Sequence, residues 1–297
     1  MKEIAILGAT ASGKTSLSIE IAKDIDANIL SLDSLSIYKE VDIVSAKPTL
    51  KERNGIKHFG IDEIYLDEPF SVVTFFELYK TAKEISQKEG KNLIIVGGTS
   101  FYLKSMIEGL SKKLVVTQEN KIKIKKQLLD LNSAYEEIKM KDVQYSSKIS
   151  AKDSYRIEKW YEIYYESNMV ASEYFDKKEK QPLIKNIEIF DILSDRELLR
   201  KNIKKRTKLM LENGLIEEVF YLEKRYTRKP MAMAAIGIKE TLLYLDGKID
   251  KDELFELISI HTAQLAKRQE TFNKSQFPNR IKLLKDDLSK YIKSYIN

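Results

Sequence analysis

The chain has 297 residues, of which 43% are hydrophobic and 32% are charged, and its formal net charge is +6. This balance excludes a disordered or collagen-like chain, and the absence of cysteine excludes disulfides, thiolate nucleophiles and thiolate metal sites. Apolar runs of four residues are far shorter than the ~18 residues that cross a bilayer, and no secretion-signal pattern opens the chain, so we expect a soluble, cytoplasmic protein without membrane contact.

Short apolar runs alternate with helical patterns in the first hundred residues. The runs at 2–7, 28–32 and 93–96 predict buried strands, whereas the apolar spacing over 14–24 and 72–88 predicts helices. Strands that alternate with helices of this length are typical of a parallel sheet with crossover helices. We therefore expect an α/β fold.

The sequence changes character near residue 112. Lysine-rich and aromatic amphipathic stretches over 112–183 predict a helical insertion domain, and the alternating segment 185–193 predicts a return to the sheet. Three further helices are expected near 195–213, 214–226 and 251–274. The predicted domains are a core formed by 1–111 plus 184–297 and the insertion 112–183.

Charge is unevenly spread between these regions. Residues 1–100 have a net charge of −3, and residues 101–297 have a net charge of +9. A basic rear half suits a polyanionic partner such as a nucleic acid, because each phosphate contact releases a counterion. An ordinary lysine-rich surface would give the same numbers, so charge permits nucleic-acid binding without showing it.

A phosphate-binding pattern follows the first predicted strand. The segment matches G-x-x-x-x-G-K-[ST] and consists of Gly8, Ala9, Thr10, Ala11, Ser12, Gly13, Lys14 and Thr15. Its glycines let backbone N–H groups cradle phosphate oxygens at a helix amino terminus. Lys14 adds a positive charge, and the Thr15 hydroxyl is a ligand for Mg²⁺. We expect a di- or triphosphate to bind here.

Polar residues follow the second and third predicted strands. Asp33 begins the segment Asp33-Ser34-Leu35-Ser36, and Thr99 follows Gly97-Gly98. The carboxyl ends of strands in an open parallel sheet lie at one edge. Asp33 and Thr99 should therefore converge beside the phosphate loop.

At this point the chain resembles the tRNA dimethylallyltransferases, also called tRNA isopentenyltransferases. Six segments match the family patterns in order: G-x-T-A-S-G-K-T at 8–15, D-S-x-Q-x-Y-[KR] at 33–39, D-I-G-T-A-K-P at 42–48, G-G-T-x-x-Y at 97–102, G-Y-[KR]-[QE] at 237–240 and K-R-Q-x-x-W at 267–272. The departures include Ala9 for proline, Ser36 for glutamine, Ile238 for tyrosine and Phe272 for tryptophan.

The resemblance implies a P-loop NTPase-like parallel sheet flanked by helices. It also implies transfer of a dimethylallyl group from dimethylallyl diphosphate to N6 of adenosine 37 in the anticodon loop of tRNAs, with release of diphosphate. Asp33 would be the general base. Lys14, Arg206 and Mg²⁺ on Thr15 would stabilise the departing diphosphate, and Thr99 would hydrogen-bond the base or the diphosphate.

The resemblance further implies contacts with the tRNA anticodon stem-loop. We expect the protein to be a monomer. The predicted substrate contacts are Asp33, Ser34, Leu35, Ser36, Thr99, Arg156, Lys159, Lys267 and Arg268. The first four would line a pocket for the extruded base. The insertion would contact tRNA. Its aromatic residues Tyr155, Trp160 and Tyr161 are either stacking partners for bases or a hydrophobic core.

Two other functions remain open from the residues alone. A small-molecule or nucleotide kinase would use the phosphate loop and Asp33, but it gives the basic half and the insertion no purpose. A non-catalytic RNA-binding module that uses nucleotide as a switch gives no role to Asp33 or Thr99.

Overall fold

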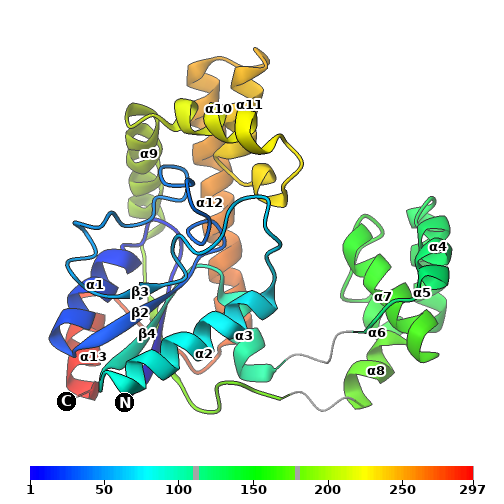
Figure 1. Cartoon of the computed structure of the whole chain (residues 1–297), viewed down its shortest axis with the longest axis horizontal. Helices are drawn as coiled ribbons and strands as arrows, with labels where there is room; N and C mark the ends of the chain where they lie inside the picture. The colour runs from blue at the N-terminus through cyan, green and yellow to red at the C-terminus, as the bar shows by residue number, and fades with distance from the viewer. Residues whose placement is uncertain (110–113, 178–180, 297) are drawn as a thin grey trace. The chain divides into compact units, whose positions relative to one another are not determined.

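The computed structural model describes residues 1–109, 114–177 and 181–296. The chain divides into two compact units: unit 1 consists of Met1–Ile107 and Ile184–Asn297, and unit 2 of Glu108–Leu183 (Figure 1). The predicted boundary between residues 111 and 112 lies outside the described residues.

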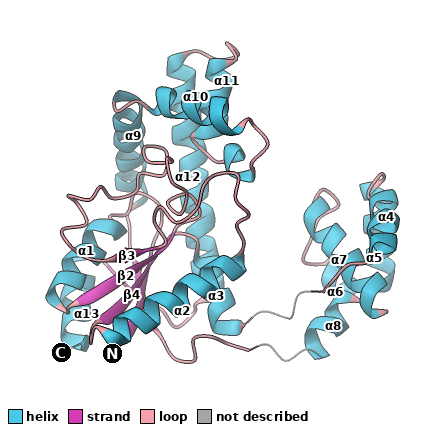
Figure 2. Cartoon of the chain, viewed as in Figure 1, coloured by secondary structure: helices cyan, strands magenta, loops and turns pink. Residues whose placement is uncertain are grey.

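Unit 1 is built on a parallel sheet whose described strands have the order β3-β2-β4-β1-β5-β6. The strands are β1 (Glu3–Leu7), β2 (Ala27–Leu32), β3 (His58–Phe59), β4 (Asn92–Gly97), β5 (Glu188–Ile192) and β6 (Ile281–Leu283). Pairing of Leu32 with Gly97 and of Leu7 with Asp191 aligns the carboxyl ends of four of them. The loops after β1, β2 and β4 therefore start at one edge of the sheet (Figure 2).

Helices cover both faces of this sheet, as a parallel sheet requires. On one face, α1 (Lys14–Asp24) and α13 (Lys285–Ile296) share a hydrophobic cluster with strand residues that include Ile4 and Ile94. On the other face, α2 (Val72–Lys88) packs on β2 and β4. A further helix, α3 (Ser100–Glu108), begins directly after β4. Successive apolar residues of a strand point to opposite faces of the sheet, and helices cover them on both faces.

A second group of helices lies beyond the carboxyl ends of the strands (Figure 1). It consists of α9 (Arg196–Glu212), α10 (Leu215–Tyr226), the short 3-10 helix η1 (Met231–Ala234), α11 (Ile238–Leu245) and α12 (Lys251–Gln276). These helices share a hydrophobic cluster with residues of the loop that follows β2, such as Ile37 and Val44. This cluster fixes that loop above the sheet edge, where the phosphate loop also lies.

Unit 2 is helical throughout its described part. Its helices are α4 (Gln118–Gln127), α5 (Leu131–Lys141), α6 (Val143–Ser146), α7 (Ser154–Ser167) and α8 (Ala171–Lys177). Trp160 and Tyr161 are fully buried in its hydrophobic core, whereas Tyr155 is 66% exposed. Of the two alternatives, the hydrophobic core is therefore confirmed for Trp160 and Tyr161, and base stacking is excluded for them because neither ring is accessible to RNA.

The structure confirms the strands and helices predicted from hydrophobic periodicity, with small shifts at their ends. The segment 185–193 forms β5, and the helices expected near 195–213, 214–226 and 251–274 are α9, α10 and α12. The sequence interpretation missed the short strands β3 and β6 and the helices α3, α11 and α13. Across the described ranges, no helix has both the length and the apolar character needed to cross a membrane.

Candidate active site

The loop between β1 and α1 has the conformation of an anion cradle. Gly13 (φ +87°) and Ala11 (φ +63°) are both left-handed, and Ser12 N–H donates to the carbonyl of Ala9 at 3.2 Å. A side chain at Gly8 would lie 2.9 Å from Ser12 Oγ. That hydroxyl is buried inside the loop and has no hydrogen-bond partner among the described residues. The first N–H groups of α1 also lack intrahelical partners and point toward the same place.

Lys14 is held in this loop by its ammonium group, which donates to the carbonyl of Ala9 at 2.6 Å. Its pKa is lowered to about 8, first by the loss of water around the ammonium group and then by repulsion from Arg206. The carboxylates of Asp33 and Asp191 act in the opposite direction on this pKa. Because Lys14 and Arg206 repel each other, a polyanion bound beside them would stabilise both charges.

Asp33 stands directly after β2, where its carboxylate is oriented by the following turn. Its Oδ1 accepts hydrogen bonds from the N–H groups of Leu35 at 2.8 Å and Ser36 at 3.1 Å. Its other oxygen, Oδ2, makes no hydrogen bond to a described residue. One oxygen thus fixes the side chain, and the other is available as a proton acceptor.

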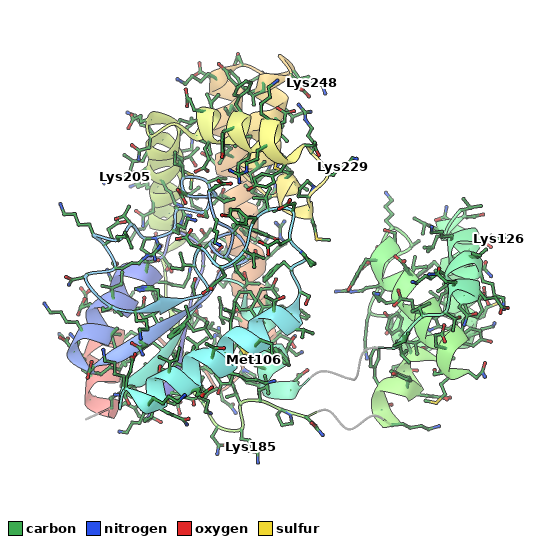
Figure 3. All side chains as sticks on the ribbon, in the orientation of Figure 1. Met106, Lys126, Lys185, Lys205, Lys229 and Lys248 are labelled. Atoms are coloured by element: carbon green, nitrogen blue, oxygen red, sulfur yellow. The ribbon has the colours of Figure 1, made fainter. Side chains whose placement is uncertain are left out.

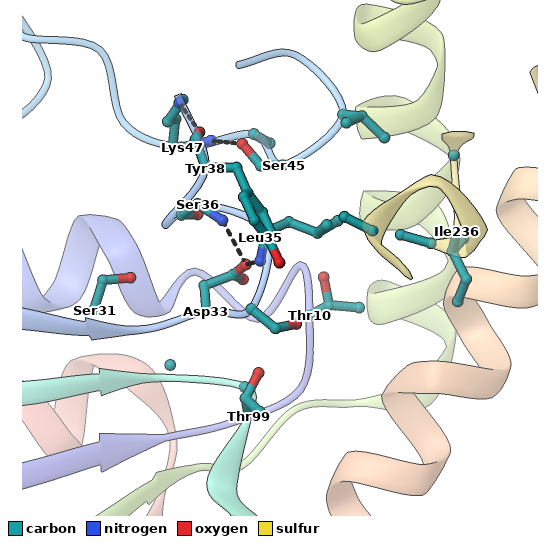
Figure 4. Close-up of a pocket in the computed structure, with 18 of the residues that line it drawn as sticks. Thr10, Ser31, Asp33, Leu35, Ser36, Tyr38, Ser45, Lys47, Thr99 and Ile236 are labelled. Atoms are coloured by element: carbon teal, nitrogen blue, oxygen red, sulfur yellow. Dashed lines mark hydrogen bonds between the residues drawn. The ribbon is translucent and has the colours of Figure 1, made fainter. Parts of the chain in front are cut away.

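Thr99 stands after β4 and is fixed through its backbone. Its N–H donates to the carbonyl of Leu32 at 3.1 Å, so the ends of β2 and β4 stay in register beyond the sheet. Figure 4 shows that Asp33, Thr99 and Thr10 come from three different strand ends and project into the same space. The sequence prediction that these loops converge is confirmed.

Arg206 reaches this space from the middle of α9. Its guanidinium group donates to the carbonyl of Ser45 at 3.1 Å, and burial lowers its pKa although the charge of Asp33 acts against that effect. Glu218 fixes the same loop from α10, because its carboxylate accepts three successive backbone N–H groups over 42–44 at 2.7 to 2.9 Å. The segment 42–48 is therefore held against two helices.

These residues surround one cavity of about 1380 Å³ in unit 1. This volume exceeds that of an ordinary small-molecule site and leaves room for a nucleobase beside a short diphosphate ester. The predicted residues that line it are Thr10, Lys14, Thr15, Asp33, Ser34, Leu35, Ser36, Thr99, Arg206 and Arg268. Phe272, where the chain departs from the family pattern, lines it too.

Other predicted residues do not line the cavity. Gly8, Ala9, Ala11, Ser12 and Gly13 shape the phosphate loop without lining the cavity, and Lys267 is exposed on α12 next to Arg268.

Arg156 and Lys159 belong to unit 2, so they are no part of a cavity built from unit 1. Arg156 pairs with Asp153 at 3.5 Å, and Lys159 pairs with Glu162 at 2.6 Å. Exposed lysines occur on both units, and Lys126 and Lys205 are examples (Figure 3).

Sequence reasoning missed Gln269 as a site residue. This side chain lines the cavity and accepts a hydrogen bond from the N–H of Thr10 at 2.8 Å. Its only sequence signal was its place as the third residue of the K-R-Q pattern. Of that pattern, only the two cations, Lys267 and Arg268, were predicted to contact the substrate. Its partner lies 259 residues away in the chain, so no local pattern could reveal the contact.

The described residues are compatible with Mg²⁺ that is bound mainly by the phosphate oxygens of a substrate. They contain no group of three or more histidine or acidic side chains that could hold a metal by themselves. However, Mg²⁺ on phosphate substrates usually needs only one or two protein ligands, with phosphate oxygens and water completing the shell. The exposed hydroxyl of Thr15, at the start of α1 and on the cavity wall, suits that arrangement.

Taken together, the cavity combines an anion cradle with a carboxylate that can accept a proton. Such a site can stabilise a departing diphosphate at one end while it deprotonates a weak nucleophile at the other. Phosphoryl transfer to a hydroxyl uses the same two parts, so the geometry by itself allows both reactions.

Comparison with known proteins identifies the family of this chain. The family model described as IPP transferase matches residues 36–276. A protein named tRNA dimethylallyltransferase from Aliarcobacter butzleri is 53% identical over 297 residues and covers 100% of both chains. One of the same name from Sulfurimonas denitrificans is 56% identical over 277 residues, or 93% of each chain.

A solved structure of a eukaryotic dimethylallyltransferase, described as acting on tRNA, has a similar fold. Its TM-score to this chain is 0.78 at 27% identity, and the alignment covers 98% of this chain and 76% of that one. The fold predicted from the resemblance, a P-loop-like parallel sheet flanked by helices, is confirmed. On the extent of these matches, the chain belongs to the IPP transferase family.

Proposed function

We propose that this protein transfers a dimethylallyl group from dimethylallyl diphosphate to N6 of adenosine 37 in the anticodon loop of tRNA, and that diphosphate is released. The observation that carries this proposal is the convergence of Asp33 and the phosphate loop on one cavity of about 1380 Å³. The names of its close relatives, all tRNA dimethylallyltransferases, favour this reaction over phosphoryl transfer.

The reaction follows from the positions of the charged groups. The N6 lone pair attacks the C1 carbon of the dimethylallyl group, the C1–O bond breaks, and its electron pair leaves with the diphosphate. Asp33 Oδ2 takes the proton that N6 loses. Lys14, Arg206 and the N–H groups of the phosphate loop stabilise the charge that develops on the diphosphate. Thr99 would hydrogen-bond the base or the diphosphate.

Mg²⁺, held by Thr15 and phosphate oxygens, would neutralise part of the charge on the leaving group. It is the one cofactor that the proposed chemistry requires. The phosphate loop would then hold a leaving group instead of passing a phosphoryl group to an acceptor.

Adenine N6 cannot reach Asp33 while the base is stacked in the anticodon loop, so the nucleotide must turn out of the stack. The turn 33–36 would form one wall of the pocket for this base. Lys267 and Arg268 of α12 would bind backbone phosphates of the anticodon stem-loop, and Arg156 and Lys159 would add contacts from unit 2. These contacts position the RNA without reading its sequence.

Every group that we assign to the chemical step belongs to unit 1, so a monomer would suffice for catalysis. We expect the protein to act in the cytoplasm, where its RNA substrate would be found.

A transfer assay tests the function directly. Purified protein is mixed with Mg²⁺, labelled dimethylallyl diphosphate and an anticodon stem-loop that carries adenosine at the target position. We expect the label to enter the RNA and to require that adenosine, and a stem-loop with guanosine there is the matched control. Transfer of phosphate from ATP to a metabolite or nucleotide, without prenylated RNA, would favour a kinase. RNA binding without either reaction would favour a non-catalytic module.

A further inference from the structure

Gln269 links two loops of the candidate active site through its side-chain amide. Its Oε1 accepts a hydrogen bond from the N–H of Thr10 at 2.8 Å, and its Nε2 donates to the carbonyl of Gly98 at 3.1 Å. A backbone N–H can only donate and a carbonyl can only accept, so the two partners fix the orientation of the amide. The contact therefore forms a bridge from the phosphate loop to the loop after β4.

The space around Gly98 fits this bridge closely. A Cβ atom on Gly98 would lie 2.3 Å from Gln269 Nε2, so any side chain there would displace the amide. The φ angle of Gly98 is not in the positive region that favours glycine. The need for glycine at this position thus comes from the approach of Gln269 and not from the backbone.

The two bridged residues adjoin groups with different tasks in the proposed reaction. Thr10 belongs to the loop that would hold the diphosphate, whereas Gly98 directly precedes Thr99, which would contact the base or the diphosphate. A bridge between them would therefore influence the distance between the leaving group and the acceptor base. Misplacement of reacting groups by about 1 Å can lower a rate by ~100-fold.

Gln269 contributes little to the packing of its own helix. The residues of α12 that are buried in unit 1 are Leu254, Ile258, Ser259, Ala266 and Asn273, whereas Gln269 is half-buried on the cavity wall. Gln269 is not one of those residues, so replacing its amide removes no buried side chain of α12. A role in packing alone therefore does not account for the bridge.

We propose that Gln269 is a positioning residue that holds the phosphate loop and the Thr99 loop at the separation required for prenyl transfer. The proposal rests on the proposed function, because it assigns the two loops to donor and acceptor. It predicts an effect on the rate of the bound complex and a smaller effect on donor affinity.

The test uses Gln269→Leu, Gly98→Ala and the double variant, with Gln264→Leu as a matched control because Gln264 is exposed on the same helix. We expect Gln269→Leu to lower kcat by about 10- to 100-fold while the donor KM changes by less than about threefold. Gln264→Leu should keep wild-type values. A kcat of Gln269→Leu within twofold of wild type overturns the proposal.

The double variant separates a bridge from two unrelated defects. Gly98→Ala should lower kcat in the wild-type background, because it displaces the amide, but should have little further effect once Gln269 is leucine. Effects that multiply in the double variant contradict the proposal. If Gln269→Leu does not fold, Gly98→Ala alone tests the proposal. A kcat of Gly98→Ala within twofold of wild type would then overturn it. Absence of prenyl transfer by the wild-type protein would instead overturn the proposed function, and this proposal with it.

Discussion

Arg206 and Ser45 are joined by a hydrogen bond of 3.1 Å in which the guanidinium group donates to the backbone carbonyl. This bond ties the middle of α9 to the 42–48 segment, and Arg206 also lines the cavity. A guanidinium group has five donors in a planar fork. Arg206 can therefore hold the loop and a diphosphate oxygen at the same time.

Replacement of Arg206 should weaken diphosphate binding. A hydrogen bond to a charged group contributes ~1.5–3 kcal/mol, so we expect Arg206→Ala to bind inorganic diphosphate about 10- to 100-fold more weakly by calorimetry. The affinity of Arg206→Lys for diphosphate should lie between those of the wild type and Arg206→Ala, because lysine keeps the charge but lacks the planar fork of donors. Arg200→Ala is the control, because Arg200 is exposed on the same helix. Equal losses for Arg200→Ala and Arg206→Ala would contradict the assignment.

Asp33 should be needed for the chemical step and not for RNA binding. Asparagine keeps an oxygen that can accept from Leu35 and Ser36, so Asp33→Asn preserves the turn and removes the base. We expect kcat to fall by about 100- to 10,000-fold and stem-loop affinity to stay within about threefold. Asp67→Asn, which removes another carboxylate from the cavity wall, is the matched control. An Asp33→Asn variant with wild-type turnover would show that another group accepts the proton.

The lowered pKa of Lys14 predicts the pH dependence of donor binding. At a pKa of about 8 the ammonium form predominates below pH 8 and is lost as the pH rises. Diphosphate binds the charged form, so its affinity should fall by up to about tenfold per unit as the pH rises above 8. Binding near pH 8 should also take up a proton, which calorimetry in buffers of different ionisation enthalpy would detect.

Two variants check that Lys14 is the group responsible. Lys14→Arg stays charged throughout this range, so its binding profile should lose the break near pH 8. Arg206→Ala removes the repulsion that lowers the pKa of Lys14, and the break should move to higher pH. A break that stays in place in Lys14→Arg would assign the titration to another group.

Much of this site was predictable because its signals are local. The phosphate loop is a contiguous pattern between an apolar strand and an amphipathic helix, and Asp33 and Thr99 each follow a strand that hydrophobic runs reveal. In a parallel sheet, the position after a strand already determines the edge where a residue lies. No tertiary information was needed to bring these three segments together.

Hydrogen bonds between segments far apart in the chain could not be predicted from the sequence. The bridge from Gln269 to Thr10 and Gly98 spans 259 and 171 residues, and no local pattern encodes it. The strand β3 consists of two residues, too few for a periodicity to be recognised. Aromatic residues at helical spacing suit both a core and a stacking surface, and only the burial of Trp160 decided between them.

The basic residues of α12 should determine the salt dependence of RNA binding. Lys267 and Arg268 are adjacent and exposed, and each phosphate that such a residue binds releases a counterion. Replacing both by alanine should weaken stem-loop binding and reduce the slope of log affinity against log salt by about 0.7 for each phosphate that is no longer bound. Lys80→Ala/Lys88→Ala on α2 changes the net charge equally and is the control. Equal slopes for the two double variants would place the RNA elsewhere.

Asp142 should determine the stability of unit 2. Its buried carboxylate accepts hydrogen bonds from Trp160 Nε1 at 3.0 Å, from Ser172 N–H at 3.0 Å and hydroxyl at 2.6 Å, and from Tyr145 N–H at 3.0 Å. Burial acts to raise the pKa of Asp142, but these hydrogen bonds outweigh it, so the pKa lies below its usual value. The stability contributed by Asp142 is therefore present above pH ~4 and lost as the pH falls through the folded-state pKa.

Trp160 makes this prediction measurable, because it is the single tryptophan of the chain and lies in unit 2. Urea unfolding followed by its fluorescence reports on unit 2. We expect Asp142→Ala to lower the free energy of unfolding by ~2–5 kcal/mol at pH 7, since the donors around it lose a charged acceptor, and to be less sensitive to acid than wild type. The control is Asp176→Ala, on the exposed face of α8, which should change the free energy of unfolding by less than ~0.5 kcal/mol. A fluorescence transition that does not move in Asp142→Ala would mean that unit 2 is held by its apolar packing alone.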